Sequence, residues 1–155
     1  MNIHASCVSL RGKGVLLLGE SGRGKSDLAL RLIDEGALLV ADDRTELYAK
    51  RGRLCARSPK SIAGLMEVRG LGIVRQPFRG DTALALAVRV GAPTTRLPEP
   101  AFYVPPPGLG PAGAVALISL DGLAASAPAR IRLALKALAK GLIGNEDSVS
   151  PHPRK

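Results

Sequence analysis

Apolar residues in the first part of the chain fall into short runs divided by glycines and charged residues. Residues 3–10 and 14–18 are two such runs, each of the length and composition of a strand. The three residues between them, Arg11-Gly12-Lys13, have the composition of a tight turn. The pattern therefore predicts an antiparallel hairpin, with His4 on the strand that pairs with residues 14–18.

A helix and a returning strand are predicted next. Apolar positions take a helical period from Ser26, Gly36 is the expected glycine after the helix, and the run 37–41 predicts a strand. About ten helical residues and about five strand residues span similar distances, and such crossovers are right-handed. We therefore expect residues 37–41 to run parallel to the strand before the helix, which brings Asp42 close to the loop that precedes Ser26.

The rest of the chain continues the alternation and then becomes irregular. Seven of the twelve prolines lie between residues 91 and 113, which excludes a central strand or a helix interior there. The remaining expected elements are a hairpin over 45–50 and 53–56, strands over 82–90 and 115–120, and a helix from Ser126 to about Gly141. These elements predict an α/β fold with a mixed sheet flanked by helices, in one domain over residues 1–143 that is followed by a polar tail over 144–155.

Composition narrows the functional classes. At 155 residues the chain suits one domain, and with 3% aromatic residues and no Trp its core must consist of Leu, Val, Ile and Ala. The net charge is +9, but the basic residues are dispersed and no nucleic-acid module accompanies them. Attraction of anionic ligands or of an acidic partner explains the charge equally well, so we expect no nucleic-acid function.

Several sites and locations are not supported by the sequence. Cys7 and Cys55 show no metal or redox spacing, so we expect them to be small buried residues. No apolar run is long enough for a membrane span, and the residues after Met1 do not form a secretion signal. The expected location is the cytoplasm.

One segment matches the phosphate-binding pattern G-x-x-x-x-G-K-[ST] at each specified position: Gly19-Glu20-Ser21-Gly22-Arg23-Gly24-Lys25-Ser26. Glycines allow the main-chain amides to surround phosphates, and the start of the following helix adds partial positive charge. In this pattern Lys25 contacts the β- and γ-phosphates and Ser26 offers its hydroxyl to Mg²⁺. A predicted strand precedes the segment and a predicted helix follows it, so the sequence indicates a site for a nucleoside triphosphate.

Two further segments contain candidate catalytic groups. Asp42 and Asp43 end the strand over 37–41, where a carboxylate could hold Mg²⁺ or accept a proton, although one could instead cap a turn and the other pair with Arg44. The segment Glu67-Val68-Arg69-Gly70-Leu71-Gly72-Ile73 alternates acid and base before two glycines. Its composition alone favours an edge strand with a bulge at a glycine.

Three segments, taken in order, resemble the catalytic domain of bifunctional HPr kinase/phosphorylase. They are the phosphate-binding segment, Ala41-Asp42-Asp43-Arg44 and the segment from Glu67 to Ile73. The resemblance implies a phosphate-loop kinase domain with a fold similar to that of phosphoenolpyruvate carboxykinase. It also implies Mg-ATP-dependent phosphorylation of a serine of the phosphocarrier HPr or a related phosphotransferase-system protein, and assembly of the chain into hexamers.

The resemblance also implies roles for individual residues. Lys25 would contact the transferred phosphate, Asp42 would be the general base toward the substrate serine, and Ser26 with Glu67 would hold Mg²⁺. His4 matches an active-site histidine ahead of the phosphate loop, and Arg96 matches a later active-site arginine. On its own, His4 would more often be an ordinary strand histidine and Arg96 a solvent-facing side chain.

The chain departs from the family pattern in its second half. The family's P-x-K-x-G-R-N segment, tied to dephosphorylation with inorganic phosphate, would fall near residues 104–110, where its lysine and arginine are absent. We therefore expect activity in the kinase direction. The alternatives are a small-molecule phosphate-loop kinase, for which an arginine-rich lid is expected, and a regulatory module that binds ATP without turnover.

Overall fold

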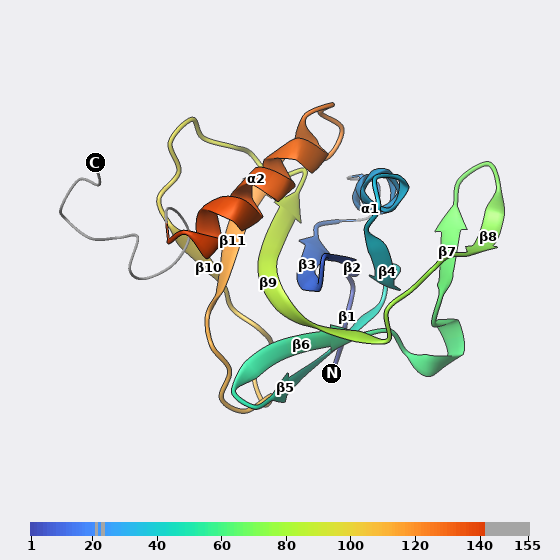
Figure 1. The fold of residues 1–155 in the computed structure, drawn as a ribbon, viewed down its shortest axis with the longest axis horizontal. Helices are drawn as coiled ribbons and strands as arrows, with labels where there is room; N and C mark the ends of the chain where they lie inside the picture. Colours follow the sequence, from blue (N-terminus) through green and yellow to red (C-terminus); the bar gives the residue numbers. More distant parts are fainter. Residues whose placement is uncertain (21, 23, 142–155) are drawn as a thin grey trace.

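A single long strand, β9 (Asp81–Val90), joins two sheets in this protein (Figure 1). The structure is a computed structural model that describes residues 1–20, 22 and 24–141. The first residues of β9 pair antiparallel with β6 (Arg53–Arg57), and the later ones pair parallel with β3 (Lys13–Leu18) and β11 (Val115–Leu120). β9 is strongly curved, so the two sheets wrap around one another.

The larger of the two sheets has β2 (Ser6–Leu10) between β3 and β4 (Leu38–Ala41), and β10 (Ala101–Tyr103) at its other edge beside β11. The smaller sheet holds β1 (Asn2–Ile3), β5 (Thr45–Lys50) and β6. Helices α1 (Lys25–Asp34) and α2 (Ala127–Ala139) lie on the larger sheet. These bounds confirm the expected α/β class and the mixed sheet.

A bulge in β9 marks the bend between the two sheets. Gly14 lies opposite Leu84, but Val15 lies opposite Leu86, so Ala85 is an extra residue in β9. A β-carbon on Gly14 would lie 2.6 Å from the Thr82 side chain, which leaves no room for any residue but glycine. The strand before the phosphate loop therefore fits closely against the bend.

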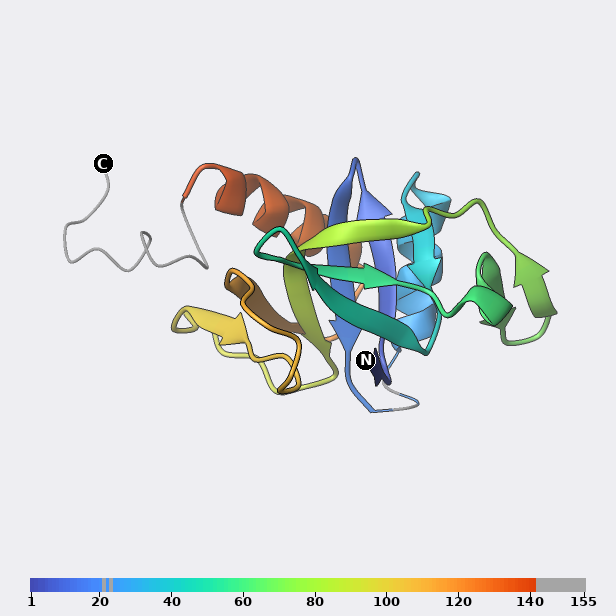
Figure 2. The same cartoon turned by 90° about the horizontal axis from the view of Figure 1, so that it is seen from below.

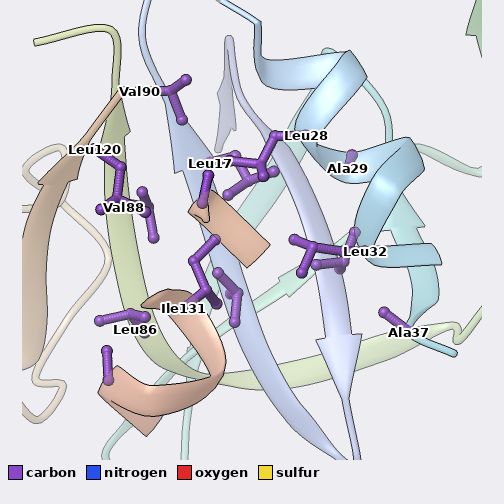
Figure 3. Close-up of a cluster of buried hydrophobic side chains, with 14 of the residues drawn as sticks. Leu17, Leu28, Ala29, Leu32, Ala37, Leu86, Val88, Val90, Leu120 and Ile131 are labelled. Atoms are coloured by element: carbon purple, nitrogen blue, oxygen red, sulfur yellow. The ribbon is translucent and has the colours of Figure 1, made fainter. Parts of the chain in front are cut away.

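Two apolar layers hold the sheets and helices together. In the first, leucines and valines of β3, β9 and β11 pack beneath α1 and α2, as Leu17, Leu28, Val88 and Ile131 show in Figure 3. The second layer lies between the two sheets, where β5 and β6 cross the opposite face of β2 and β3 (Figure 2). Cys7 and Cys55 are both buried free thiols, as expected.

The expected single strand over residues 3–10 is wrong. Asn2 and Ile3 pair with β5 in the smaller sheet, whereas Ser6 to Leu10 pair with β3 in the larger one. The chain crosses from one sheet to the other at His4 and Ala5, so His4 lies between strands rather than on a partner of the phosphate-loop strand.

The direction expected for β4 is right, but β4 is not a neighbour of β3. β4 pairs antiparallel with β2, which itself pairs antiparallel with β3, so β4 and β3 point the same way with β2 between them. The crossover places the end of β4 at the same edge of the sheet as the end of β3.

The expected edge strand with a bulge over residues 67–73 is also wrong. The segment forms a separate hairpin of β7 (Leu65–Val68) and β8 (Gly72–Arg75), which projects at one end of the molecule (Figure 1). Gly70 has φ 89° and the Leu71 amide donates to the Val68 carbonyl at 2.9 Å, so the glycine serves a tight turn.

The later elements lie close to their expected positions. The strand over 115–120 and the helix ending near Gly141 are confirmed, and the proline-rich stretch contains only the short edge strand β10. The expected tail over 144–155 lies outside the described residues, so the boundary at residue 143 stays a prediction. No helix in the described part of the chain is long and apolar enough to cross a membrane.

Candidate functional site

The glycine-rich segment connects the end of β3 to the start of α1. Gly19 has φ 141°, and a β-carbon there would lie 2.5 Å from the Val90 carbonyl oxygen, so glycine is required where the segment passes the end of β9. Of the eight residues predicted to bind the nucleotide, Ser21 and Arg23 lie outside the described residues. The other six begin at the sheet edge where β3 and β9 both end.

The start of α1 presents main-chain amides at this edge. Gly24 is the residue before the helix, has φ 91°, and its carbonyl accepts from the Leu28 amide at 2.9 Å. No side chain among the described residues caps this end of α1. The first amides of a helix lack partners within it and attract anions, so this geometry suits a phosphate group.

Lys25 is buried at the base of this segment, with 5% of its surface exposed. Its Nζ donates to the Gly19 carbonyl oxygen at 2.5 Å. Burial lowers the pKa of Lys25, while the nearby carboxylates of Asp43 and Asp42 oppose that change. The ammonium group is therefore held inside the curve of the segment by a contact that a phosphate oxygen can replace.

Asp42 lies at the centre of a hydrogen-bond cluster. Its Oδ1 accepts from the Ser26 hydroxyl at 3.2 Å and from the Ser6 hydroxyl at 3.5 Å, and its Oδ2 accepts from the Glu67 main-chain amide at 2.9 Å. Burial raises the pKa of Asp42, and the hydrogen bonds from Glu67 and Ser26 partly offset that rise. One half-buried carboxylate thus links α1, β2 and the hairpin.

Asp43 points outward, unlike its neighbour. Its side chain is 63% exposed and lies 3.3 Å from Nε2 of His4, while its amide donates to the Ser6 hydroxyl at 2.9 Å. Asp43 has φ 65°, a left-handed conformation that aspartate tolerates better than most residues. The turn therefore directs one carboxylate into the cluster and the other toward solvent and His4.

Ser6 was not anticipated as a site residue. It is fully buried, donates to Asp42 and accepts from the amide of Asp43, so it holds both aspartates in their places. The available signal was a hydroxyl within the apolar run Ala5-Ser6-Cys7-Val8, because a buried hydroxyl needs a hydrogen-bond partner.

The other expected site residues are less closely connected. Glu67 contacts Asp42 through its main chain, while its side chain is exposed. Arg96 is exposed in the stretch that follows β9, and the structure records no hydrogen bond or ion pair between it and another described residue. The geometry brings Lys25, Ser26 and Asp42 together, with His4 at the rim and Arg96 apart.

The oxygen atoms present suit a magnesium ion. No group of three or more His, Cys, Asp and Glu side chains in the described parts of the chain could hold a metal ion by itself. The Ser26 hydroxyl nevertheless lies 3.2 Å from Asp42, whose other oxygen accepts a hydrogen bond from the main-chain amide of Glu67, a residue that carries a further carboxylate. Mg²⁺ is commonly held by one or two such oxygen ligands together with phosphate oxygens. The Ser26 hydroxyl donates its proton to Asp42, so its lone pairs are left for a cation.

Comparisons with known proteins give matches both in sequence and in structure. The family model described as the HPr Serine kinase C-terminal domain matches residues 1–83. The HPr kinase/phosphorylase of Clostridium beijerinckii is 49% identical over 72 residues, which cover 46% of this chain and 24% of that protein. That of Lactobacillus johnsonii is 45% identical over 74 residues, covering 47% of this chain and 23% of that protein. The matched segment thus spans about a quarter of these relatives.

A solved structure extends the similarity beyond residue 83. The Hpr(Ser) kinase/phosphatase from Coxiella burnetii superposes with a TM-score of 0.73 and covers 92% of this chain and 98% of its own. Its sequence is 24% identical, so this match concerns the fold.

Proposed function

Because the chain belongs to the HPr serine kinase C-terminal domain family, we propose that it is a Mg-ATP-dependent protein serine kinase that phosphorylates HPr or a related phosphocarrier. One observation supports the proposal above the others: Asp42 accepts hydrogen bonds from both Ser26 of the phosphate loop and Glu67 of the hairpin. This observation supports a role for one carboxylate in contacting both the nucleotide phosphate and the incoming hydroxyl.

In the proposed reaction Mg-ATP supplies the phosphoryl group. The serine oxygen of the carrier protein forms the new bond to phosphorus, the bond to the bridging oxygen breaks, and its electron pair leaves with ADP. Asp42 orients the serine hydroxyl and receives its proton. Lys25 releases the Gly19 carbonyl and neutralises charge on the phosphate oxygens, and Ser26 with Glu67 would hold Mg²⁺.

His4 and Arg96 have supporting roles in this proposal. His4 lies beside Asp43 at the rim of the site, where it can contact the transferred phosphate or the carrier protein. Arg96 follows β9, whose end adjoins Gly19, so the stretch that contains Arg96 begins at the site. We assign Arg96 to charge neutralisation when the carrier protein is bound.

The test is phosphate transfer from labelled ATP to purified HPr in the presence of Mg²⁺. Asp42→Asn and Lys25→Ala are each expected to reduce the transfer rate by at least ~100-fold, because the first removes the proton acceptor and the second removes the charge that neutralises the phosphate oxygens. Asp34→Asn is the matched control, since that carboxylate is exposed at the far end of α1. Binding of ATP with no phosphoserine on any carrier protein would overturn the proposal.

The metal assignment has its own measurement. Glu67→Gln should raise the Mg²⁺ concentration needed for half-maximal transfer by roughly tenfold while the main-chain bond to Asp42 remains. Glu99→Gln, an exposed glutamate in the proline-rich stretch, is the control. An unchanged Mg²⁺ requirement in Glu67→Gln would remove Glu67 from the metal site.

The kinase direction is proposed as the main activity. Residues 104–110 follow the edge strand β10 and lack the basic residues that the family pattern uses in dephosphorylation, and Val104 is 84% exposed. Transfer of the phosphoryl group from phosphoserine-HPr to inorganic phosphate, which frees the serine hydroxyl and forms pyrophosphate, is expected to be at least ~10-fold slower than transfer from ATP to HPr. Equal rates in the two directions would contradict this proposal.

A further inference from the structure

The loop between β11 and α2 lies at the same sheet edge as the phosphate loop. β11 runs parallel to β9, and β9 runs parallel to β3, so all three strands end at this edge. The order across the sheet is β11, β9, β3, β2, β4. The phosphate loop after β3 therefore lies between Asp42, which follows β4 on one side, and residues 121–126, which follow β11 on the other.

Arg31 holds this loop against α1. Its Nη1 donates to the Ala124 carbonyl at 3.1 Å, its Nη2 donates to the Gly122 carbonyl, and its Nε donates to Asp27 Oδ2 at 3.0 Å. Figure 1 shows the loop, at the start of the orange segment that leads into α2, beside α1. A side chain from the phosphate-loop helix thus sets the position of a loop more than 90 residues later in the chain.

Leu123 stands at the tip of this loop and next to the phosphate loop. Its amide donates to Asp121 Oδ1 at 3.0 Å, which closes a local turn. Its Cδ2 lies 3.3 Å from where a β-carbon on Gly24 would be, so the side chain covers the residue before α1. Even so, 72% of Leu123 is exposed. A large apolar side chain is held beside an anion-binding helix start with most of its surface free.

The order of the strands decides what that surface can contact. If the γ-phosphate lies at Asp42, a triphosphate that follows the loop has its nucleoside end on the side of β9 and β11. On that side, the described part of the chain places the exposed apolar side chain of Leu123 next to Gly24 of the phosphate loop. The flat faces of a nucleobase are apolar enough to pack against a leucine, and the association removes apolar surface from water.

We propose that Leu123 is the platform against which the nucleobase of ATP packs, with Arg31 as the residue that positions it. This inference rests on the proposed function, because it takes the γ-phosphate to lie at Asp42. It adds a determinant of nucleotide binding from the part of the chain beyond residue 83.

The test compares two ligands that share their phosphates and differ in the base. Dissociation constants of Mg-ATP and Mg-tripolyphosphate are measured by calorimetry for the wild type, Leu123→Ala and Leu133→Ala. Leu133 is the control because it is a 66% exposed leucine on α2. Leu123→Ala should raise the dissociation constant of ATP roughly five- to tenfold, since the contact with the base is lost. It should change the dissociation constant of tripolyphosphate less than about twofold, because that ligand has no base.

Arg31→Gln is the second variant. This variant should also weaken the binding of ATP and leave the affinity for tripolyphosphate unchanged, because it frees the loop over residues 121–126 but does not alter the phosphate site. The proposal is overturned if Leu123→Ala weakens the binding of both ligands equally, or if it leaves the affinity for ATP unchanged. An unchanged affinity for ATP is the result expected if Leu123 instead docks the carrier protein. A wild type that binds neither ligand would instead remove the proposed function.

Discussion

Residues 1–83 and residues 84–141 contribute different things to the same fold. The buried polar and charged side chains of the described chain are Ser6, Ser9, Lys25, Thr45 and Thr82, and all five lie in the first region. The second region supplies buried apolar residues from β9, β11 and α2. A buried polar group requires a particular partner, whereas an apolar contact requires mainly size and shape.

The comparisons with relatives follow the same division. The family model matches the region that holds the buried polar groups, while the similarity across both regions is one of fold at 24% identity. Apolar packing tolerates many substitutions that conserve volume, but a hydrogen-bond cluster such as that around Asp42 does not. The first region therefore holds the hydrogen-bonded cluster of the candidate site, and the second contributes mainly apolar packing.

A substitution in the apolar layer of the second region should have the largest effect on stability. Ile131→Ala removes a fully buried side chain from the layer beneath α2 and should lower the free energy of unfolding by about 2–5 kcal/mol. The dissociation constant of ATP for the folded protein should not change. Urea denaturation measures the free energy of unfolding, and calorimetry at low temperature measures the dissociation constant of ATP. Loss of ATP binding by the folded variant would contradict the difference in role between residues 1–83 and 84–141.

A substitution at the bend between the two sheets, where β9 passes from the first region into the second, should have an intermediate effect. Gly14→Ala places a β-carbon 2.6 Å from the Thr82 side chain and 2.7 Å from the Ala83 carbonyl, so β3 or β9 must shift, and we expect a loss of about 1–3 kcal/mol in thermal or urea denaturation.

Gly80→Ala is the matched control for this bend. No atom lies within 4 Å of a β-carbon at that position, and its φ is not left-handed, so it should change stability by less than about 1 kcal/mol. Equal losses in the two variants would show that the close fit at Gly14 does not limit stability.

The smallest expected effect is a pH dependence in the first region. Because burial raises the pKa of Asp42, the folded protein binds this proton more tightly than the unfolded chain does. The stabilising contribution is complete below the ordinary value of 3.8 and is lost as the pH rises through the raised pKa. Relative to Asp42→Asn, the wild type should therefore lose stability with rising pH.

This change in the free energy of unfolding of the wild type, relative to Asp42→Asn, should stay within about 1 kcal/mol. The effect is small because Asp42 is only half-buried and solvent screens part of its charge. Urea denaturation of both proteins from pH 3.5 to about 7 measures it. A wild type that gains stability over this range relative to Asp42→Asn would mean that hydrogen bonds to the carboxylate outweigh its burial.

Local patterns predicted elements whose residues interact mainly with their neighbours in the chain. The hairpin turn at Arg11 and Gly12 and the helix after Lys25 follow from turn residues and apolar period, and both are present. The strand over 3–10 was predicted wrongly because its break at His4 comes from pairing with two different sheets. Nothing in the local composition distinguishes a strand that changes sheets from one that continues.

The candidate site divides in the same way. Lys25 and Ser26 were identified from the spacing of glycines, because a phosphate loop consists of consecutive residues whose main chain forms the site. Which of Asp42 and Asp43 faces inward was open, since the answer depends on Ser6 and on the hairpin amide of Glu67. Those contacts join residues 25 or more positions apart.

The sequence by itself determined that this protein has a glycine-rich anion site between a strand and a helix, because the required backbone conformations belong to adjacent residues. Only the tertiary structure decided what surrounds that site. Because β2 lies between β3 and β4, Ser6 comes close to Asp42. Because β11 runs parallel to β9 and ends at the same edge of the sheet, Leu123 comes close to Gly24. Such neighbours are set by strand order, which depends on long-range packing and not on local sequence.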